Sequence, residues 1–155
     1  MSEPRPRIAR SSTGRAVARK LALQAVYSWQ LNPVPWQDLL VQFGTGEEAA
    51  GVDRDYLREL LEGICEDQGG LDARVAEFAQ LPGRPLDPIE KAALLIGIFE
   101  LQARPEVPYR VAISEAVSLA RRFGATDGHK FVNAVLDRAA RTLRTHEQPS
   151  GDAAR

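Results

Sequence analysis

The chain contains few of the residues that build metal sites and covalent cross-links. Its 155 residues include one cysteine, Cys65, and two histidines. A single cysteine cannot form an internal disulfide, and these side chains are too few for a zinc or iron site of ordinary spacing. No apolar run approaches the length of a membrane span, and the N-terminus lacks the apolar segment of a signal peptide. We therefore expect a cytoplasmic protein that holds no metal, no other cofactor and no membrane span.

Strand patterns and catalytic groupings are also scarce. Almost no segment shows the alternation typical of a strand, so no glycine-rich phosphate loop follows a strand and neither nucleotide-binding fingerprint applies. The paired carboxylates between residues 47 and 55 have no neighbouring base or apolar pocket. Ser114 and His129 are a conceivable nucleophile and base, but Ser114 occupies an ordinary outward position of an amphipathic helix. The sequence therefore predicts that the protein is not an enzyme.

Helical periodicity covers most of the chain. Hydrophobic residues at 44% and charged residues at 26% are ordinary for a globular domain. Apolar residues recur at helical spacing in the segments 13–31, 36–43, 53–68, 71–80, 88–103, 109–123 and 127–144. We predict an all-α fold, a single-domain helical bundle of about seven helices over residues 13–144. The basic N-terminal arm, residues 1–12, and the tail, residues 145–155, lack periodicity and are expected to be disordered.

Three helix boundaries carry clear local signals. Asp87 followed by Pro88 predicts a capped helix start, and the helix that follows is apolar on nearly all sides, so we expect it to be central. Gly124 is expected to close the helix before it in the left-handed conformation. Thr126 or Asp127 is expected to cap the last helix by accepting a hydrogen bond from one of its unpaired N–H groups.

The charged residues are strongly segregated along the chain. Residues 1–20 hold six basic residues against one acidic residue, a net charge of +5. Residues 38–72 hold ten acidic residues against two basic ones, a net charge of -8. This asymmetry indicates two surfaces with different partners, nucleic acid for the basic part and a basic protein for the acidic part. A basic tail that only improves solubility is the simpler alternative.

Cations and an aromatic ring at the two ends of the chain suggest RNA binding. RNA-binding surfaces combine cations for phosphates with rings for unstacked bases. The candidates are Arg15, Arg19, Lys130, Phe131 and Arg141, provided that the first and last helices lie side by side. Lys130 and Phe131 also have plainer interpretations: at such positions a lysine is usually solvated, and a phenylalanine usually belongs to the core. The sequence alone leaves both interpretations open.

Four segments resemble the NusB family of transcription antitermination factors, in the family's order. They are residues 18–31 (ARKLALQAVYSWQL), 86–92 (LDPIEKA) with 99–101 (FEL), 107–117 (VPYRVAISEAV), and 122–137 (RFGATDGHKFVNAVLD). The resemblance covers the chain from about Arg15 to Arg144 and is specific. It implies an all-α fold of two three-helix halves and an RNA-binding adaptor without catalytic activity. It also implies a pair with NusE, a small-subunit ribosomal protein, that binds boxA RNA and joins the RNA polymerase elongation complex with other Nus factors.

The resemblance also assigns roles to individual RNA-binding residues. Asp127, Lys130 and Phe131 match positions implicated around RNA, and Arg15 and Arg19 match a basic N-terminal motif. Some family members carry a denser arginine cluster there than this chain does, so fewer phosphate contacts are expected. The alternative is that Arg5, Arg7 and Arg10 of the N-terminal arm compensate when RNA binds.

The same resemblance points to the surface that meets NusE. Tyr27 and Glu90 match positions implicated at that interface, and Leu23 lies on the same partly apolar stripe of the first helix as Tyr27. A self-associating protein-interaction or ribosome-assembly module with a slight RNA role, including a homodimer, is the alternative. Similar helical domains also precede a ribosomal RNA methyltransferase domain, and since only a short tail follows Arg144 we expect no catalytic domain here.

Overall fold

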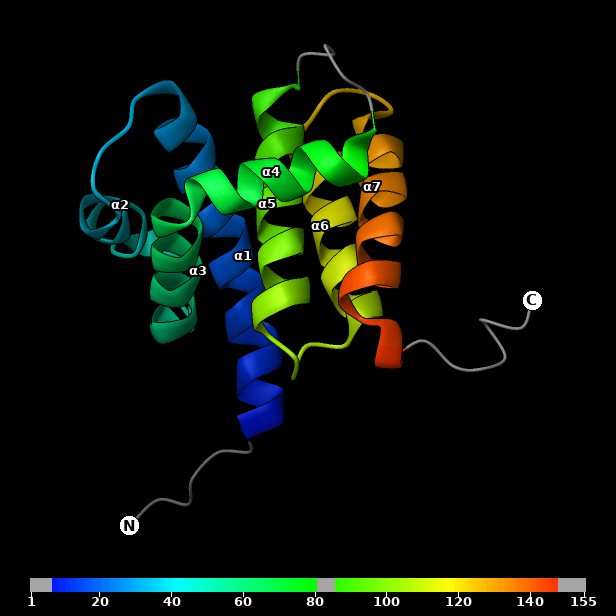
Figure 1. The fold of residues 1–155 in the computed structure, drawn as a ribbon. Coiled ribbons are helices and arrows are strands. Elements are labelled where there is room, and N and C mark those ends of the chain that lie inside the picture. The colour runs from blue at the N-terminus through cyan, green and yellow to red at the C-terminus, as the bar shows by residue number, and fades with distance from the viewer. Residues whose placement is uncertain (1–6, 81–85, 148–155) are drawn as a thin grey trace. The chain divides into compact units, whose positions relative to one another are not determined.

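The structure, a computed structural model, consists of helices joined by short loops (Figure 1). It describes residues 7–80 and 86–147, with side chains from residue 12 onward. The elements are α1 (Arg7–Leu31), α2 (Trp36–Phe43), η1 (Glu47–Ala49), α3 (Arg54–Glu66), α4 (Gln68–Ala79), α5 (Pro88–Ala103), α6 (Tyr109–Phe123), α7 (Gly128–Leu143) and η2 (Thr145–Glu147). Within these ranges there is no strand, and the predicted all-α fold of about seven helices is confirmed. None of the helices described is both long and apolar enough to cross a bilayer.

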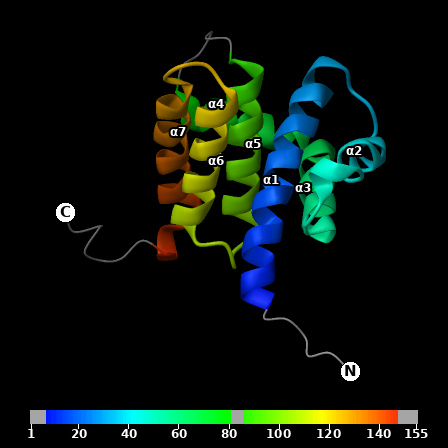
Figure 2. The same ribbon diagram turned by 180° about the vertical axis from the view of Figure 1, so that it is seen from behind.

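The chain divides into two compact units, where the sequence had suggested a single domain. The first comprises Met1–Glu66 and the second Asp67–Arg155. In the first unit α1 packs on α2 and α3, and the apolar residues of α3 are buried as predicted. In the second unit α5 contacts α4, α6 and α7. Figures 1 and 2 show α5, α6 and α7 side by side, with α4 crossing them.

Gly14 sets the distance between α1 and the start of α3. A Cβ at Gly14 would lie 3.0 Å from both Cβ and N of Asp53, which is an unusually tight contact, so glycine is favoured at this approach. The Asp53 backbone N–H donates to the Gly14 carbonyl at 3.1 Å, and Asp53 Oδ1 accepts from the Tyr56 backbone N–H at 3.0 Å. Asp53 therefore caps α3 and ties it to α1 at the level of Arg15.

The start of α5 is the boundary that the sequence predicts best. Asp87 Oδ2 accepts from the backbone N–H groups of Ile89 at 3.0 Å and Glu90 at 3.2 Å, and Pro88 occupies the first turn. Every residue of the segment 92–101 is buried, which confirms that this helix is central in its unit. At Gly97 an added Cβ would lie 2.7 Å from Leu136 Cδ1, so glycine allows α7 to approach α5 closely.

Arg144 differs in burial from its place in the helical pattern, which puts it with Lys130 and Arg141 on the polar side of the last helix. Its side chain is buried and donates to the carbonyl oxygens of Leu101 at 2.7 Å, Glu100 at 3.1 Å and Arg104 at 2.8 Å. These carbonyls lie at the C-terminal end of α5. Those of Glu100 and Arg104 also accept from the backbone N–H groups of Arg104 and Val107, both at 3.0 Å. Arg144 also pairs with the carboxylate of Glu147. The last residues of α7 therefore cap α5.

A second arginine of α7 has the same role at another helix end. Arg138 Nε donates to the Phe78 carbonyl at 2.7 Å, and its Nη2 donates to the Ala79 carbonyl at 3.4 Å. Both carbonyls lie in the last turn of α4. Since Arg144 caps α5, one helix supplies the side chains that satisfy the ends of two others.

Several predicted boundaries differ from the structure. α1 begins at Arg7, within the arm that was expected to be disordered, and Thr145–Glu147 form a short helical turn in the expected tail. α4 begins at Gln68, before the predicted start at residue 71, and includes Gly69 and Gly70. The rest of the predicted arm and tail, residues 1–6 and 148–155, lies outside the described residues.

Candidate nucleic-acid interface

The turn between α6 and α7 differs from its predicted form at Gly124. The Gly124 N–H donates to the Ala120 carbonyl at 2.8 Å, which ends α6, but the backbone has φ of -97° and ψ of -173°. This is extended backbone and not the predicted left-handed conformation. A Cβ there would lie 2.7 Å from the Ala120 oxygen and 3.3 Å from Ile89 Cγ2. Lack of space therefore favours glycine at this position.

Asp127 is the residue of this turn that adopts the left-handed conformation, with φ of 72°. A capping side chain normally requires backbone in the extended region, so the carboxylate is badly placed to accept from α7. No side chain makes the predicted cap bond at this helix start, so that prediction is wrong. Instead Asp127 Oδ1 lies 3.3 Å from Lys130 Nζ. Both side chains are largely exposed, Lys130 at 72% and Asp127 at 67%.

Glu90 lies beneath this helix start and not on the surface that its predicted partner role assumes. Its side chain is buried, and a Cβ added to Gly128 would lie 2.5 Å from Glu90 Oε2. The first turn of α5 is thus packed against the first residue of α7. The structure corrects the expected exposure of Glu90, and its contact with NusE stays a prediction.

The remaining residues of the predicted site on α7 differ in exposure. Phe131 is half-buried, so its ring is neither a fully buried core residue nor fully open to stack on a base. Arg141 is exposed. Lys130 and Phe131 are neighbours in the first turn, so an ammonium group and a partly exposed ring lie at the same end of the helix. This combination is suited to a phosphate and an unstacked base.

In the first unit Arg15 and Arg19 share one aromatic contact. The guanidinium carbon of Arg15 lies 4.1 Å from the ring centroid of Tyr56, and that of Arg19 lies 5.7 Å away. Both distances are within the range of cation–π attraction. Arg15 is half-buried, whereas Arg19 is only 4% exposed, so the structure corrects the expectation that Arg19 is open to a phosphate. The side chain of Arg10 lies outside the described residues.

The predicted second stripe of α1 is only partly exposed. Tyr27 is 37% exposed and Leu31, one turn further on, is 62% exposed. Leu23, one turn before Tyr27, is fully buried. The structure therefore supports Tyr27 as a residue that can meet a partner, and corrects the expected exposure of Leu23.

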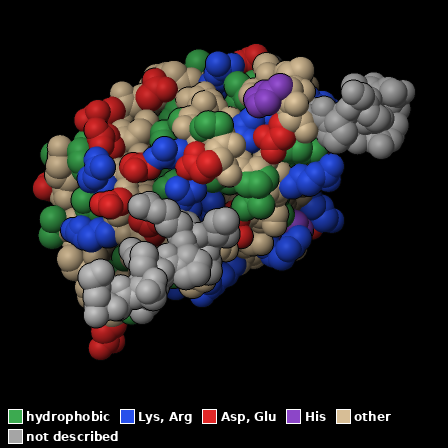
Figure 3. All heavy atoms as spheres, turned by 90° about the horizontal axis from the view of Figure 1, so that it is seen from below, with side chains coloured by type: hydrophobic (Ala, Val, Ile, Leu, Met, Phe, Trp, Pro, Cys, Tyr) green, Lys and Arg blue, Asp and Glu red, His purple; other side chains and the backbone are tan. Residues whose placement is uncertain are grey.

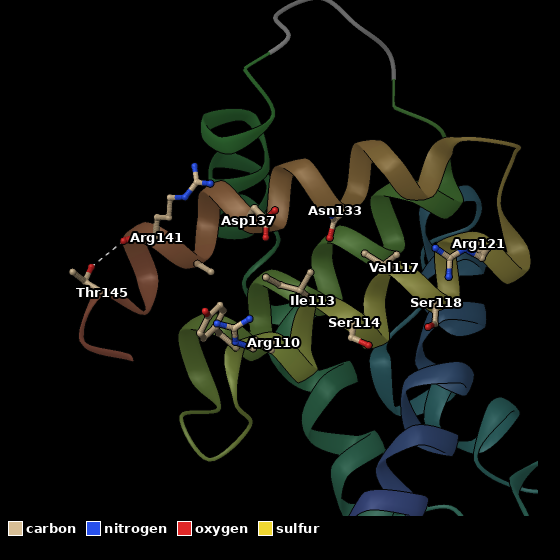
Figure 4. A pocket seen from close by; sticks show the side chains of 12 residues that line it. Arg110, Ile113, Ser114, Val117, Ser118, Arg121, Asn133, Asp137, Arg141 and Thr145 are labelled. Atoms are coloured by element: carbon tan, nitrogen blue, oxygen red, sulfur yellow. Dashed lines mark hydrogen bonds between the residues drawn. The ribbon is translucent and has the colours of Figure 1, made fainter. Parts of the chain in front are cut away.

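A groove between α6 and α7 contains functional candidates that the sequence analysis did not assemble. It has a volume of about 850 Å³. Arg110 and Arg121 line it from α6, and Arg141 lines it from α7 (Figure 4). The polar residues of α6 repeat at helical spacing, which marks one face of that helix. The sequence does not show which face of α7 lies opposite this face of α6. In the structure Asn133 and Asp137 of α7 lie there.

The structure brings some candidates together within the second unit. Arg141 joins the groove, and Asp127, Lys130 and Phe131 share the start of α7. A joint surface with Arg15, which depends on adjacent first and last helices, stays a prediction. Figure 3 shows a face on which basic and acidic side chains are interspersed. On that face individual cations, and not a uniform positive field, are available to a polyanion.

The single cysteine has the environment of a structural thiol. Cys65 is half-buried, and burial, followed by the charge of Glu66, raises its pKa to about 11. A thiol with such a pKa is mostly protonated near neutral pH and is a poor nucleophile. Among the described residues no group of three histidine, cysteine, aspartate or glutamate side chains is arranged to hold a metal ion.

Comparisons with known proteins agree with the resemblance in the sequence. Residues 16–141 match the model of the NusB family. The chain is 46% identical over 134 residues to the "Transcription antitermination protein NusB" of Idiomarina loihiensis, covering 86% of this chain and 96% of that protein. It is 48% identical to the protein of the same name from Shewanella pealeana, covering 80% of this chain and 92% of that protein.

A solved structure has the same fold. A NusB structure from T. maritima superposes with a TM-score of 0.71, covers 100% of both chains and is 21% identical in sequence. At this identity the structural similarity shows the fold alone.

Proposed function

Because the chain belongs to the NusB family, we propose that it is a transcription antitermination factor that binds boxA-type RNA of ribosomal RNA leader transcripts together with NusE. It acts in the cytoplasm as a binding protein, without catalysis, and supports processive transcription as part of the RNA polymerase elongation complex with other Nus factors. The observation that carries the proposal is the exposure of two side chains at the start of α7, which lies within the residues that match the family model. There Lys130 exposes 72% of its side chain beside the partly exposed ring of Phe131.

The proposed RNA contacts follow from the chemistry of these groups. Lys130 supplies a phosphate contact that fixes the strand without reading its sequence, and Phe131 supplies a stacking face for an unpaired base. In the first unit Arg15 adds a guanidinium whose position is restrained by the Tyr56 ring. Restraint before binding reduces the conformational entropy that the side chain loses on the RNA.

The proposed contact with NusE is based on the exposed side of α1. Tyr27 combines a large apolar surface with a hydroxyl group, which is typical of residues at protein interfaces. Leu31 extends this exposed apolar surface by one turn. Both residues lie in residues 18–31, one of the segments that resemble the family.

A titration of boxA RNA with and without NusE tests this proposal. We expect the full chain with NusE to bind boxA RNA more tightly than a scrambled RNA of the same length and composition. Light scattering of the same samples shows whether the chain acts as a single copy or as a homodimer. Equal affinity for the two RNAs in the presence of NusE contradicts the proposal.

Replacing Lys130 with alanine is expected to weaken binding of boxA and scrambled RNA alike, because a phosphate contact carries no sequence information. The slope of log affinity against log salt should fall by about 0.7 for a single-stranded RNA when one phosphate contact is lost. The measurement is fluorescence anisotropy over a salt series. Arg58→Ala is the matched control, since Arg58 is an exposed cation that pairs with Glu62 at 2.9 Å. An unchanged slope for Lys130→Ala excludes this contact.

Replacing Asp127 with asparagine is expected to tighten RNA binding by a few-fold. Asparagine tolerates the left-handed backbone at this position, while the change removes a negative charge beside the phosphate and releases Lys130 from its ion pair. The same anisotropy assay measures the gain, and Asp38→Asn, at an exposed site on α2, controls for net charge. Weaker binding of Asp127→Asn would show that the carboxylate contributes a favourable contact.

A further inference from the structure

The groove between α6 and α7 has cations at both ends. Arg110 and Arg121 lie at opposite ends of α6, roughly 16 Å apart along the helix axis at about 1.5 Å per residue. Arg141, in the last turn of α7, lies at the Arg110 end, as Figure 4 shows. All three side chains are exposed. A ligand with negative charges spaced along an extended chain matches this arrangement.

The middle of the groove presents hydrogen-bonding groups and one carboxylate. Ser114 and Ser118 line it from α6, and Asn133 and Asp137 line it from α7 (Figure 4). A carboxylate between cations repels phosphates, so it is poorly suited to a uniform polyanion. It accepts hydrogen bonds from hydroxyl groups, and the ribose 2′-OH of RNA is such a donor. DNA has no equivalent group.

An aromatic ring lies at one end of the same groove. The guanidinium carbon of Arg110 lies 5.2 Å from the ring centroid of Tyr109, and both residues line the groove. A ring and a guanidinium plane are the two surfaces on which unstacked bases pack. An acidic peptide could pair with the arginines, but its carboxylates would lie near Asp137 and be repelled by it. Such a peptide also has no planar base to pack on Tyr109 and Arg110. The lining therefore favours RNA over an acidic peptide.

The groove begins close to the proposed boxA site. Lys130 and Asn133 are three positions apart on α7, and residues at this spacing are neighbours on a helix surface. From Asn133 the groove continues past Asp137 to Arg141. A strand held at Lys130 can therefore run along α7 into the groove without leaving the protein surface.

We propose that the α6–α7 groove is a second RNA subsite, which takes the single-stranded ribose-phosphate chain adjoining the segment held at Lys130. The inference rests on the proposed RNA-binding function and extends it. Arg121 and Arg141 contact phosphates at the two ends of the subsite, and Asp137 accepts a hydrogen bond from a ribose hydroxyl between them. The subsite binds by shape and charge, so it adds affinity for longer transcripts of any flanking sequence.

The test uses the full chain with NusE and three oligonucleotides: minimal boxA RNA, boxA RNA extended on either side, and boxA RNA with a deoxyribose extension. Arg121→Gln and Arg141→Gln should each weaken binding of the extended RNA several-fold and lower its salt slope by about 0.7, and Arg121→Gln should leave binding of minimal boxA unchanged. Asp137→Asn should reduce the preference for the ribose over the deoxyribose extension. Arg74→Gln, at a half-buried cation paired with Glu77 on α4, is the matched control.

The outcomes separate this inference from the proposed function. If Lys130→Ala weakens every RNA while Arg121→Gln and Arg141→Gln do not affect the extended one, the subsite is excluded and the boxA role remains. If boxA is not preferred over scrambled sequence but both arginine variants weaken extended RNA, the boxA role fails and the subsite remains. A glutamate-rich peptide that binds in an Arg121-dependent manner, when extended RNA does not, identifies the groove as a peptide site and overturns the inference.

Discussion

Replacement of Arg144 with methionine is expected to lower the free energy of unfolding by about 3 kcal/mol. Methionine keeps a long apolar side chain but removes every donor, so the carbonyls of Glu100, Leu101 and Arg104 lose their hydrogen bonds from Arg144 in a buried site. Glu147 also loses its cation. Urea denaturation, followed by circular dichroism, measures the change.

Arg141→Met is the matched control for this prediction, because Arg141 lies on the same helix but is exposed. Its substitution should change the free energy of unfolding by less than about 0.5 kcal/mol, as is usual at the surface. Equal effects of the two variants would contradict the assignment of Arg144 as the cap of α5.

The pH dependence of stability gives a second view of the same cluster. Burial by itself raises the pKa of Glu147, but hydrogen bonds from the Tyr109 backbone N–H and from Arg144 outweigh it, so the net shift is downward. Because the pKa of Glu147 is lower in the folded state than in the unfolded chain, its ionised carboxylate stabilises the fold at pH values above the ordinary glutamate pKa. This stabilisation is lost as the pH falls through the lowered pKa of the folded state. The Arg144 variant should therefore lose less stability on acidification than the parent protein.

Gly128→Ala is expected to cost about 2 kcal/mol and to weaken RNA binding together with stability. The added methyl group would lie 2.5 Å from Glu90 Oε2 and 3.0 Å from its carboxyl carbon, in a place where Glu90 is buried. Either the Glu90 carboxylate or the start of α7 must move. If the start of α7 moves, Lys130 and Phe131 move with it. Denaturation and boxA anisotropy on the same variant measure both effects.

Gly69→Ala is the control for this change. Gly69 lies in the first turn of α4, and a Cβ there meets nothing within 4 Å. Alanine at this position should be neutral or stabilising by up to about 1 kcal/mol, since glycine is the poorer helix former. If Gly128→Ala behaves in the same way, Glu90 does not fix the position of the α7 start.

Features that depend on local sequence were predicted correctly. The apolar stripes of α3 and α5 and the cap at Asp87 each depend on residues within a few positions of one another. The turn from Gly124 to Asp127 was predicted less well. Asp127 adopts the left-handed conformation that was expected of Gly124, and glycine at position 124 is favoured because an added Cβ would meet the Ala120 oxygen and Ile89. A helical pattern cannot register such a neighbour from another helix.

In the candidate site too, properties set by neighbours in the sequence were predictable, and properties set by contacts with other helices were not. Exposure of Lys130 and Tyr27 follows from helical position, whereas burial of Glu90 and Arg19 depends on packing between helices. Arginine at a polar position normally indicates a solvated side chain, and burial of Arg144 is explained only by carbonyls more than 40 positions away in the chain.

The two arginines of α7 also affect the order in which the chain can fold during synthesis. The residues that α1, α2 and α3 contribute to their mutual contacts have all been made once Glu66 is added, since the three helices lie within the first unit. The ends of α4 and α5, in contrast, wait for Arg138 and Arg144, which are among the last described residues to be made. Since translation proceeds at about 5–20 residues per second, the ends of α4 and α5 lack the hydrogen bonds from Arg138 and Arg144 for seconds after these ends have been made.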